Sequence, residues 1–351
     1  MRSKRNTAGT LWLSYPVRLL AAALLWLLFI SAMHHWLNSG HDRRQVIKMG
    51  YMPVITNLAA PLLDYASIRA ESKLRFKAIK FASFAEMAEA LRNDEIHAAF
   101  IIAPLSIVLR QQGEDVKVVY IGNRHESTFV VHKNIQASGL SDLSGRTIAV
   151  PMRYSGHNLG VLKAISDAGM DGQIRIVEMN PPDMASALSA GSLDGYFVGE
   201  PFAAQTLKNG DSKLLYYVEE SWPGFICNLL LVRQRFIDRD AAAVRRLVQG
   251  AIRSGLWAQQ HPQEAAKIVS SYWGQPADLV KYALTTPEGR IVYDRYVPKK
   301  AEMAEIADLM VRFGLLASND IDGLVDDRFA IGANRQGADG IDAILNAPPA
   351  R

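Results

Sequence analysis

Cysteine is almost absent from this chain of 351 residues, which contains only Cys227. A single cysteine cannot form an internal disulfide, a thiolate metal cluster or a Cys-x-x-Cys redox pair. None of the first 40 residues is a cysteine, which excludes a lipid anchor on an N-terminal cysteine of the leader. We therefore expect the fold to depend on hydrophobic cores, and the length suffices for two domains of ordinary size.

An excess of basic charge is also absent outside the leader. The net charge is +4, but the 39 basic residues include Arg2, Lys4, Arg5 and Arg18, and the other 35 equal the number of acidic residues. The body therefore lacks the basic surface that binds a phosphate backbone, and no nucleic-acid partner is predicted.

The common signatures of nucleotide binding and hydrolysis are missing as well. The chain has no G-x-x-x-x-G-K-[ST] loop, no G-x-G-x-x-G at a strand–helix junction, no G-x-S-x-G elbow and no His-Glu-x-x-His helix. The sequence therefore predicts no cofactor, no metal site and no catalytic residues, although these absences do not exclude an enzyme whose residues are dispersed.

What is present begins with a leader. Basic residues precede the apolar run Leu19–Met33, which is the pattern of a secretory signal peptide. The run has fifteen residues, fewer than the roughly 20 of a membrane-spanning helix. We therefore expect residues 1–40 to be a signal peptide that is cleaved on export. The less favoured alternative is an uncleaved signal-anchor that tethers the protein through residues 17–37.

The clearest feature of the body is an internal echo. Met87–Leu105 returns 97 positions later as Met184–Phe202, without a gap and with six identical positions of nineteen. Both copies have the pattern of a helix, a polar turn, a buried strand and a proline. Two similar α/β units indicate two similar lobes, and a cleft between lobes indicates a ligand.

Short β-rich runs, among them Leu74–Lys80, Ala98–Ile102 and Thr147–Val150, alternate with amphipathic segments. This alternation predicts an α/β fold of two Rossmann-like lobes with mainly parallel sheets. We expect the apolar strands Thr128–His132 and Phe225–Val232 to cross between the lobes.

The predicted parts are lobe I over 44–128, lobe II over 129–224, a return crossover with C-terminal helices packing on lobe I over 225–316, and a tail over 317–351. The first of the C-terminal helices is expected to begin at Ala241. The last twenty residues are expected to be mobile.

Ligands of such sheets bind beyond the carboxyl ends of the strands, where helices begin. In lobe I these junctions hold Thr56, Asn57, Ser83 and the pair Ala103-Pro104. Thr56 and Ser83 are also expected to be N-caps, and Ser83-Phe-Ala-Glu86 is typical of a capping box. Capping and ligand contact are compatible with each other at both positions.

In lobe II the segment Met152–Asn158 joins a strand to a helix and contains Tyr154, Ser155, His157 and Asn158. Its hydroxyl, imidazole and free amides predict a seat for a small anion, and the alternative is an ordinary loop. His157 alone is a weaker candidate, because a lone histidine often only hydrogen-bonds its neighbours.

Four more residues are candidates. Glu200 takes the place of Ala103 in the echo, and it either faces the ligand or bridges the hinge by pairing with a basic residue of the other lobe. Trp222 either covers a ligand with its ring or packs the hinge. Ser127 and Thr128 flank the outgoing crossing and are short enough to line the floor of a cleft.

Four segments of the chain resemble one family. They are Gly50–Pro61 with its Ala-Pro pair, Ala98–Leu105, Leu143–Val150 and Asp194–Phe202. Through them the chain is similar, from about Lys48 to Asp327, to the periplasmic solute-binding proteins of nitrate/sulfonate/taurine-type ABC transporters, which have the type II periplasmic-binding-protein fold.

The resemblance implies two lobes that close on a small anion such as a sulfonate, taurine or nitrate in the periplasm. Delivery to an ABC permease and its ATPase subunit would follow. Carried over by position, the implied ligand shell comprises Thr56, Asn57, Ser83, Phe84, Ala103, Pro104, Ser127, Thr128, Tyr154, Ser155, His157, Asn158, Glu200 and Trp222. Asn57 departs from the family's pattern, because the nitrate-like branch commonly has Asp there.

Two other functions stay open at this point. A tethered sensory or regulatory subunit would signal from its closed form and would keep residues 1–40. An enzyme similar to the thiamine-pyrimidine synthases would share the fold, but those enzymes carry a cysteine-rich signature that Cys227 alone does not supply. The favoured prediction is a solute receptor that is not an enzyme.

Overall fold

The structure is a computed structural model that describes residues 15–38, 44–334 and 340–345. Its N-terminal element is the helix α1, Tyr15–Asn38. The stretch Tyr15–His34 is apolar, unburied and long enough to cross a membrane, and a signal sequence passes the same test. The expectation that the apolar segment is too short to span is therefore wrong, because the helix extends past both ends of Leu19–Met33.

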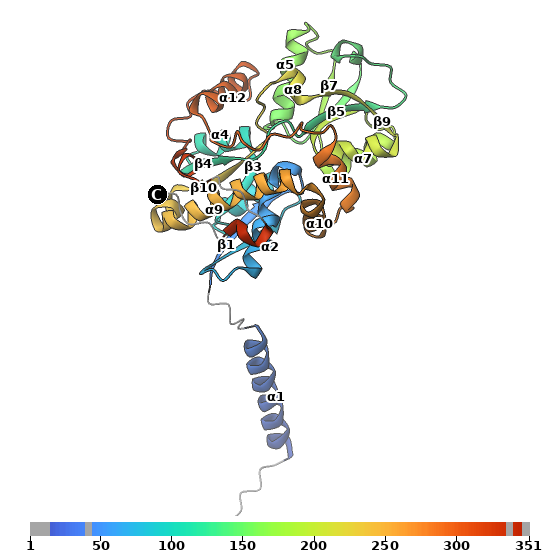
Figure 1. Cartoon of the computed structure of the whole chain (residues 1–351). Coiled ribbons are helices and arrows are strands. Elements are labelled where there is room, and N and C mark those ends of the chain that lie inside the picture. The colour runs from blue at the N-terminus through green and yellow to red at the C-terminus, as the bar shows by residue number, and fades with distance from the viewer. Residues whose placement is uncertain (1–14, 39–43, 335–339, 346–351) are drawn as a thin grey trace, which may run out of the picture. The chain divides into compact units, whose positions relative to one another are not determined.

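The body contains two sheets of five strands each, shown in Figure 1. The sheet of lobe I has the order β2-β1-β3-β10-β4. Its strands are β1 (Gln45–Tyr51), β2 (Leu74–Lys80), β3 (Ala98–Ile102), β4 (Val116–Ile121) and β10 (Asn228–Arg233). All five residues of the central strand β3 are buried, as expected for an apolar strand covered on both faces.

The helices of lobe I begin where its strands end. They are the 3-10 turn η1 (Ile55–Asn57) and the α-helices α2 (Ala59–Arg69), α3 (Phe84–Arg92) and α4 (Ala103–Gln111). Ser83 caps α3 as predicted, since its Oγ accepts a hydrogen bond of 3.2 Å from the Glu86 amide. Pro104 lies in the first turn of α4, where its missing N–H costs nothing.

The sheet of lobe II has the order β7-β6-β8-β5-β9. Its strands are β5 (Ser127–His132), β6 (Thr147–Val150), β7 (Arg175–Glu178), β8 (Gly195–Gly199) and β9 (Ser212–Tyr217). Its helical elements are η2 (Leu140–Leu143), α5 (Gly156–Asp167), α6 (Pro181–Ser189), α7 (Phe202–Asn209) and α8 (Val218–Ser221).

The two sheets have the same plan, which explains the echo in the sequence. In lobe I the central strand β3 is parallel to β1 and antiparallel to the crossing strand β10. In lobe II the central strand β8 is parallel to β6 and antiparallel to the crossing strand β5. The predicted fold of two mainly parallel α/β lobes joined by two crossover strands is therefore confirmed.

The C-terminal segment is helical. Its elements are α9 (Gln234–Gln260), α10 (Pro262–Trp273), α11 (Ala277–Thr285), α12 (Lys300–Arg312), α13 (Arg328–Ile331) and η3 (Ile341–Leu345). The helix expected to begin at Ala241 is confirmed as the second part of α9, because the backbone at Asp240 is non-helical and separates it from a shorter helix that begins at Gln234 and was not predicted. Asp240 caps the second half of the helix, since its Oδ1 accepts the Ala243 amide at 2.9 Å.

Part of the tail is ordered against lobe I. η3 packs on α2 and α9, and Ile341 and Ile344 are buried in the same hydrophobic cluster as those helices. The Arg253 side chain donates to the carbonyls of Ala343 and Ile344 at 2.7 and 2.9 Å. The expectation that the last twenty residues are mobile is therefore wrong for Ile341–Leu345; residues 335–339 and 346–351 lie outside the described chain.

The two lobes are packed against each other beside the crossing strands. One hydrophobic cluster of lobe I includes Leu159 of α5, and Met152 lies against its margin. Val54 of lobe I is buried in a cluster of lobe II together with Phe202. The Ile55 amide also donates to the Glu200 carbonyl at 2.8 Å across the two lobes. The lobes are thus in contact at the mouth of the hinge.

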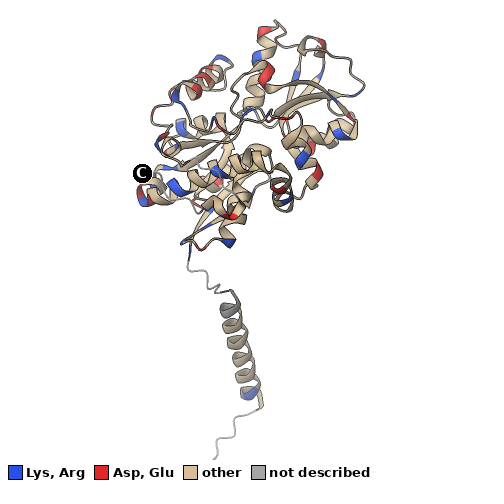
Figure 2. Ribbon diagram, in the orientation of Figure 1, with Lys and Arg blue, Asp and Glu red and all other residues tan. Residues whose placement is uncertain are grey.

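The charged residues of the body are distributed as its balanced composition predicts. Figure 2 shows basic and acidic residues interspersed over both lobes. Many of them pair locally, as in the ion pair of 3.1 Å between Arg146 and Asp194 in lobe II. Exposed pairs of this kind contribute about 0–1 kcal/mol each, so the stability of the lobes rests on their apolar cores.

Candidate functional site at the hinge

The site lies where the carboxyl ends of the central strands meet the two crossing strands. In lobe I the Ala103 amide, directly after β3, donates to the Cys227 carbonyl at 3.0 Å. In lobe II the Glu200 amide, directly after β8, donates to the Glu126 carbonyl at 3.0 Å. Ala103 and Glu200 are equivalent positions of the echo. Both lobes therefore bind their crossing strand through the same backbone hydrogen bond.

A side-chain contact to the crossing strand is also repeated, once within each lobe. The Asn228 side chain, at the start of β10, donates from Nδ2 to Oδ1 of Asn57 at 2.7 Å. Ser127, at the start of β5, shares a hydrogen bond of 2.9 Å between its Oγ and Nε2 of His157. Asn57 follows β1, and His157 follows the corresponding strand β6. Each lobe therefore fixes one crossing strand with a buried polar side chain.

The N-terminus of α5 has the geometry of an anion seat. Ser155 is its N-cap, and its Oγ accepts the Asn158 amide at 3.0 Å. Nδ2 of Asn158 donates to the Arg153 carbonyl at 2.8 Å and fixes the preceding loop. The first amides of a helix have no acceptor within the helix, and here they belong to Gly156 and His157. Their dipoles favour a negative group in front of α5.

Thr56 is not the N-cap that the sequence predicted. The residue lies inside η1, which begins after Val54, and the residue before α2 is Leu58. Thr56 Oγ1 is buried and finds no hydrogen-bond partner in the described chain. A Cβ on Gly122 would lie 2.7 Å from this oxygen, so the glycine keeps the space beside it open. The turn η1, which the sequence did not predict, moves the start of the α-helix past Thr56.

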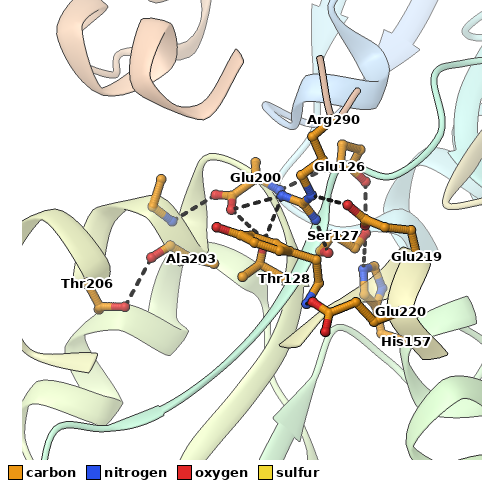
Figure 3. A network of polar contacts seen from close by, with 12 residues as sticks. Glu126, Ser127, Thr128, His157, Glu200, Ala203, Thr206, Glu219, Glu220 and Arg290 are labelled. Carbon is orange, nitrogen blue, oxygen red and sulfur yellow. Dashed lines mark hydrogen bonds and ion pairs between the residues drawn. The ribbon is translucent and has the colours of Figure 1, made fainter. Parts of the chain in front are cut away.

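Glu200 bridges the hinge by pairing with a basic side chain, which was the second of its two predicted roles. One carboxylate oxygen accepts from Thr128 Oγ1 at 2.7 Å, and the other accepts the Ala204 amide at 2.7 Å. The basic side chain is Arg290, whose Nη1 lies 4.0 Å from Glu200 Oε1. Figure 3 shows the Arg290 guanidinium between Glu200 and Glu219. Whether Glu200 also contacts a ligand stays a prediction.

Arg290 is a residue that sequence reasoning missed. It lies in the segment between α11 and α12 and is almost fully buried. Its Nε donates to Glu219 Oε1 at 2.9 Å, its Nη1 donates to Thr128 Oγ1 at 3.1 Å, and its Nη2 donates to the Ser127 carbonyl. The guanidinium also lies 4.0 Å from the ring centroid of Tyr217. A single arginine in an irregular segment carries no periodic signal that would reveal these contacts.

Glu126 was missed for the same reason, although it directly precedes β5. Its carboxylate accepts the Glu200 amide at 2.9 Å and Ser127 Oγ at 3.0 Å, and its side chain is buried. A Cβ on Gly199 would lie 2.9 Å from Oε2 of Glu126. The echo has Ile102 at the position of Gly199, so the glycine of lobe II makes the space that this carboxyl group occupies.

Burial controls the charges of the hinge. It raises the pKa of Glu126 to about 7, the nearby Glu200 adds to the rise, and hydrogen bonds from Cys227 and Ser127 oppose it. Burial also raises the pKa of Glu200, against the hydrogen bond from Thr128 and the charge of Arg290. Burial lowers the pKa of His157 to about 3, so His157 is a neutral ring at pH 7. Its Nδ1 has no partner in the described chain.

The other predicted residues are buried or half-buried in the body. Phe84 and the Ala103-Pro104 pair are buried in lobe I. Tyr154 and Trp222 are half-buried against the hydrophobic cluster of lobe I, and the Trp222 ring lies 5.5 Å from that of Phe225. Trp222 therefore packs the hinge in this structure. Among the described residues, no group of three His, Cys, Asp or Glu side chains is placed to hold a metal ion.

Two duplicated α/β lobes, two crossing strands and a buried polar hinge with a helix N-terminus define the class of two-lobed solute-binding proteins. The model of the NMT1-like family matches residues 40–272, and the chain belongs to that family.

Two relatives are similar over most of the body. A protein of Bacillus subtilis (strain 168) named as an aliphatic sulfonates-binding protein is 26% identical over 269 residues, which are 73% of this chain and 77% of that protein. The taurine-binding periplasmic protein of Escherichia coli (strain K12) is 29% identical over 220 residues, 60% of this chain and 65% of that protein.

A solved structure has the same fold. The ligand-binding component of an ABC-type import system from Staphylococcus aureus, crystallised with zinc bound, superposes with a TM-score of 0.75. The match covers 84% of this chain and 100% of that one, at 23% identity. These relatives are binding proteins, and the apolar N-terminal helix of this chain fits a signal sequence.

Proposed function

We propose that this protein is the solute-binding component of an ABC importer, that it captures a small sulfonate-like anion at the hinge, and that it is not an enzyme. Hinge closure would hold the anion between the lobes, and the closed form would deliver it to a permease with its ATPase subunit. Such a device uses binding energy to favour the closed form over the open one. The names of the sulfonate-binding and taurine-binding relatives support this ligand class.

One observation carries the proposal: the N-terminus of α5 lies at the buried polar hinge between two lobes that are packed together. The amides of Gly156 and His157 begin the helix, and the Ser155 cap fixes its first turn. Thr56 Oγ1 and His157 Nδ1 are buried polar atoms with no partner in the described chain. Buried polar atoms without partners are unfavourable unless a ligand or water satisfies them.

The site is not purely cationic, and this bears on the ligand. Glu126, Glu200 and Glu219 lie around the guanidinium of Arg290. A ligand that combines a sulfonate with an ammonium group would place the sulfonate at the amides of α5 and the ammonium near the glutamates. An alkanesulfonate without an ammonium group would use only the helix amides. We therefore expect taurine to bind more tightly than ethanesulfonate.

We also propose that the protein acts in the periplasm. The helix α1 would direct its export, and α1 is long enough to stay in the membrane as a tether. N-terminal sequencing of the mature protein separates the two outcomes. A first residue beyond Asn38 indicates cleavage, and an intact N-terminus indicates a tethered receptor.

The test is thermal unfolding of the full chain in detergent against taurine, ethanesulfonate, nitrate, bicarbonate and sulfate. A ligand at about 100 times its dissociation constant adds roughly 2.7 kcal/mol to the free energy of unfolding. Ser155→Ala should weaken binding, because it removes the cap of α5. Asp142→Ala is the matched control, since Asp142 accepts hydrogen bonds from the Ser138 amide and hydroxyl at η2, on the surface of lobe II. No response to any of the anions would contradict the proposed function.

A further inference from the structure

A cavity of about 300 Å³ lies in lobe I at the end of its strands that is opposite the hinge. Its lining includes Asp94, His97, Arg233, Arg235, Phe236 and Arg239, and we name it the arginine cavity. β10 begins at the hinge with Asn228 and ends at Arg233, whereas β3, which ends at the hinge, is preceded by His97. The cavity is therefore separated from the hinge by the length of these strands.

Two of the three arginines have partners of opposite charge. Arg235 forms an ion pair with Asp94. Arg233 donates to the carbonyls of Leu91 and Arg92, and its guanidinium lies 3.4 Å from Glu114. Each of these two guanidinium groups is thus opposed by one carboxylate.

The charge of the third arginine is not balanced in this way. Among the residues that the structure describes, none forms a hydrogen bond or an ion pair with Arg239. Its guanidinium lies 5.6 Å from the ring centroid of Phe236. The N–H donors of this guanidinium have no acceptor among the described residues. Positive charge therefore exceeds negative charge in the arginine cavity.

His97 offers a fixed hydrogen-bond donor to the same space. The Lys48 amide donates to its Nδ1 at 3.0 Å, so the proton of the neutral ring is on Nε2. The ring is half-buried and lies 5.4 Å from that of Phe236. Burial, with the charges of Arg239 and Lys48, lowers the pKa of His97. At neutral pH the ring is thus neutral and donates from Nε2. An anion bound beside it would favour the protonated form of the ring.

We propose that the arginine cavity binds a phosphoryl group, as a phosphate ester that is either free in solution or the headgroup of an anionic phospholipid. Guanidinium groups match phosphate oxygens in paired hydrogen bonds, and the volume leaves room for the ester substituent. The cavity lies beside the first strand of lobe I, because Gln45, the first residue of β1, donates to Asp240 of α9 at 3.0 Å. Both sources would present the same phosphate oxygens to the guanidinium groups.

The test is calorimetric titration of the full chain in detergent with glycerol 3-phosphate and with dihexanoyl-phosphatidylglycerol. Arg239→Gln should weaken the binding at least tenfold. Arg245→Gln is the matched control, because Arg245 lies on the same helix with its guanidinium 5.8 Å from the Phe329 ring, outside the cavity. It should leave the affinity within twofold. Tighter binding of the free ester indicates a soluble ligand, and tighter binding of the lipid indicates a headgroup.

A second measurement follows the His97 ring by NMR. Its pKa should rise when the phosphate ester is bound, and this rise should disappear in Arg239→Gln. Absence of binding by both compounds, or equal binding in Arg239→Gln and Arg245→Gln, would overturn the proposal. The sulfonate response at the hinge should be the same in both variants, so that failure of this proposal is distinguishable from failure of the proposed function.

Discussion

Replacement of Glu126 by glutamine should stabilise the protein at pH 8 and have little effect at pH 5. The pKa of this buried carboxyl is about 7 in the folded chain against an ordinary value of 4.5. The folded state therefore binds the proton more tightly than the unfolded state. The contribution of Glu126 to the free energy of unfolding falls as the pH rises from about 4.5 to about 7, by about 3 kcal/mol in total.

The surrounding hydrogen bonds allow the amide. Oε2 of Glu126 accepts the Glu200 amide, and this oxygen can be retained as the glutamine carbonyl. The other oxygen accepts from Ser127 Oγ at 3.0 Å. The Cys227 thiol, which also hydrogen-bonds this carboxyl group, can donate to Asn228 Oδ1 at 3.3 Å instead. The glutamine NH₂ can donate to Ser127 Oγ instead, because the serine hydroxyl can turn and donate to His157 Nε2, 2.9 Å away. The histidine proton then moves to Nδ1, which has no partner in the described chain.

The assay is urea unfolding of wild type and Glu126→Gln at pH 5 and pH 8. The difference between the two proteins removes the titration of all other groups, and it should grow by about 2.5 kcal/mol between these pH values. Glu89→Gln is the control. Its side chain is 59% exposed and pairs with Arg92, so its effect should be within about 0.5 kcal/mol at both pH values. A difference for Glu126→Gln that is the same at both pH values would refute the reasoning.

Three further outcomes are expected. Arg290→Met should lower the free energy of unfolding by about 3 kcal/mol, because it leaves the charge of Glu219 without its partner; a loss below about 1 kcal/mol in urea unfolding would show that the ion pair is dispensable. Gly199→Ala should cost about 1–3 kcal/mol in the same assay, since its Cβ would lie 2.9 Å from a carboxylate oxygen, and a neutral result would mean that the hinge adapts. Cys227, buried and with its pKa raised by burial, should react with a thiol reagent only in urea; labelling of the native protein would contradict its burial.

The sequence predicted the elements and their order because both depend on local patterns. Hydrophobic period and turn residues placed β2, β3 and β6 to the residue. The echo implied two equivalent sheets, and the cap at Ser83 was predictable because the hydrogen bond that it accepts spans only three residues. The substitution of Glu200 for Ala103 in the echo identified the hinge as the place where the lobes differ.

Only the tertiary structure decided the chemistry of the hinge. Arg290 lies ninety residues from Glu200 in the sequence, and no local pattern predicts that they meet. The pKa values of Glu126 and His157 come from burial by both lobes, and the charge of the arginine cavity results from the partners that Arg233 and Arg235 find in the folded chain. Hydrophobic periodicity and capping act within a few residues, whereas burial and charge pairing are properties of the packed chain.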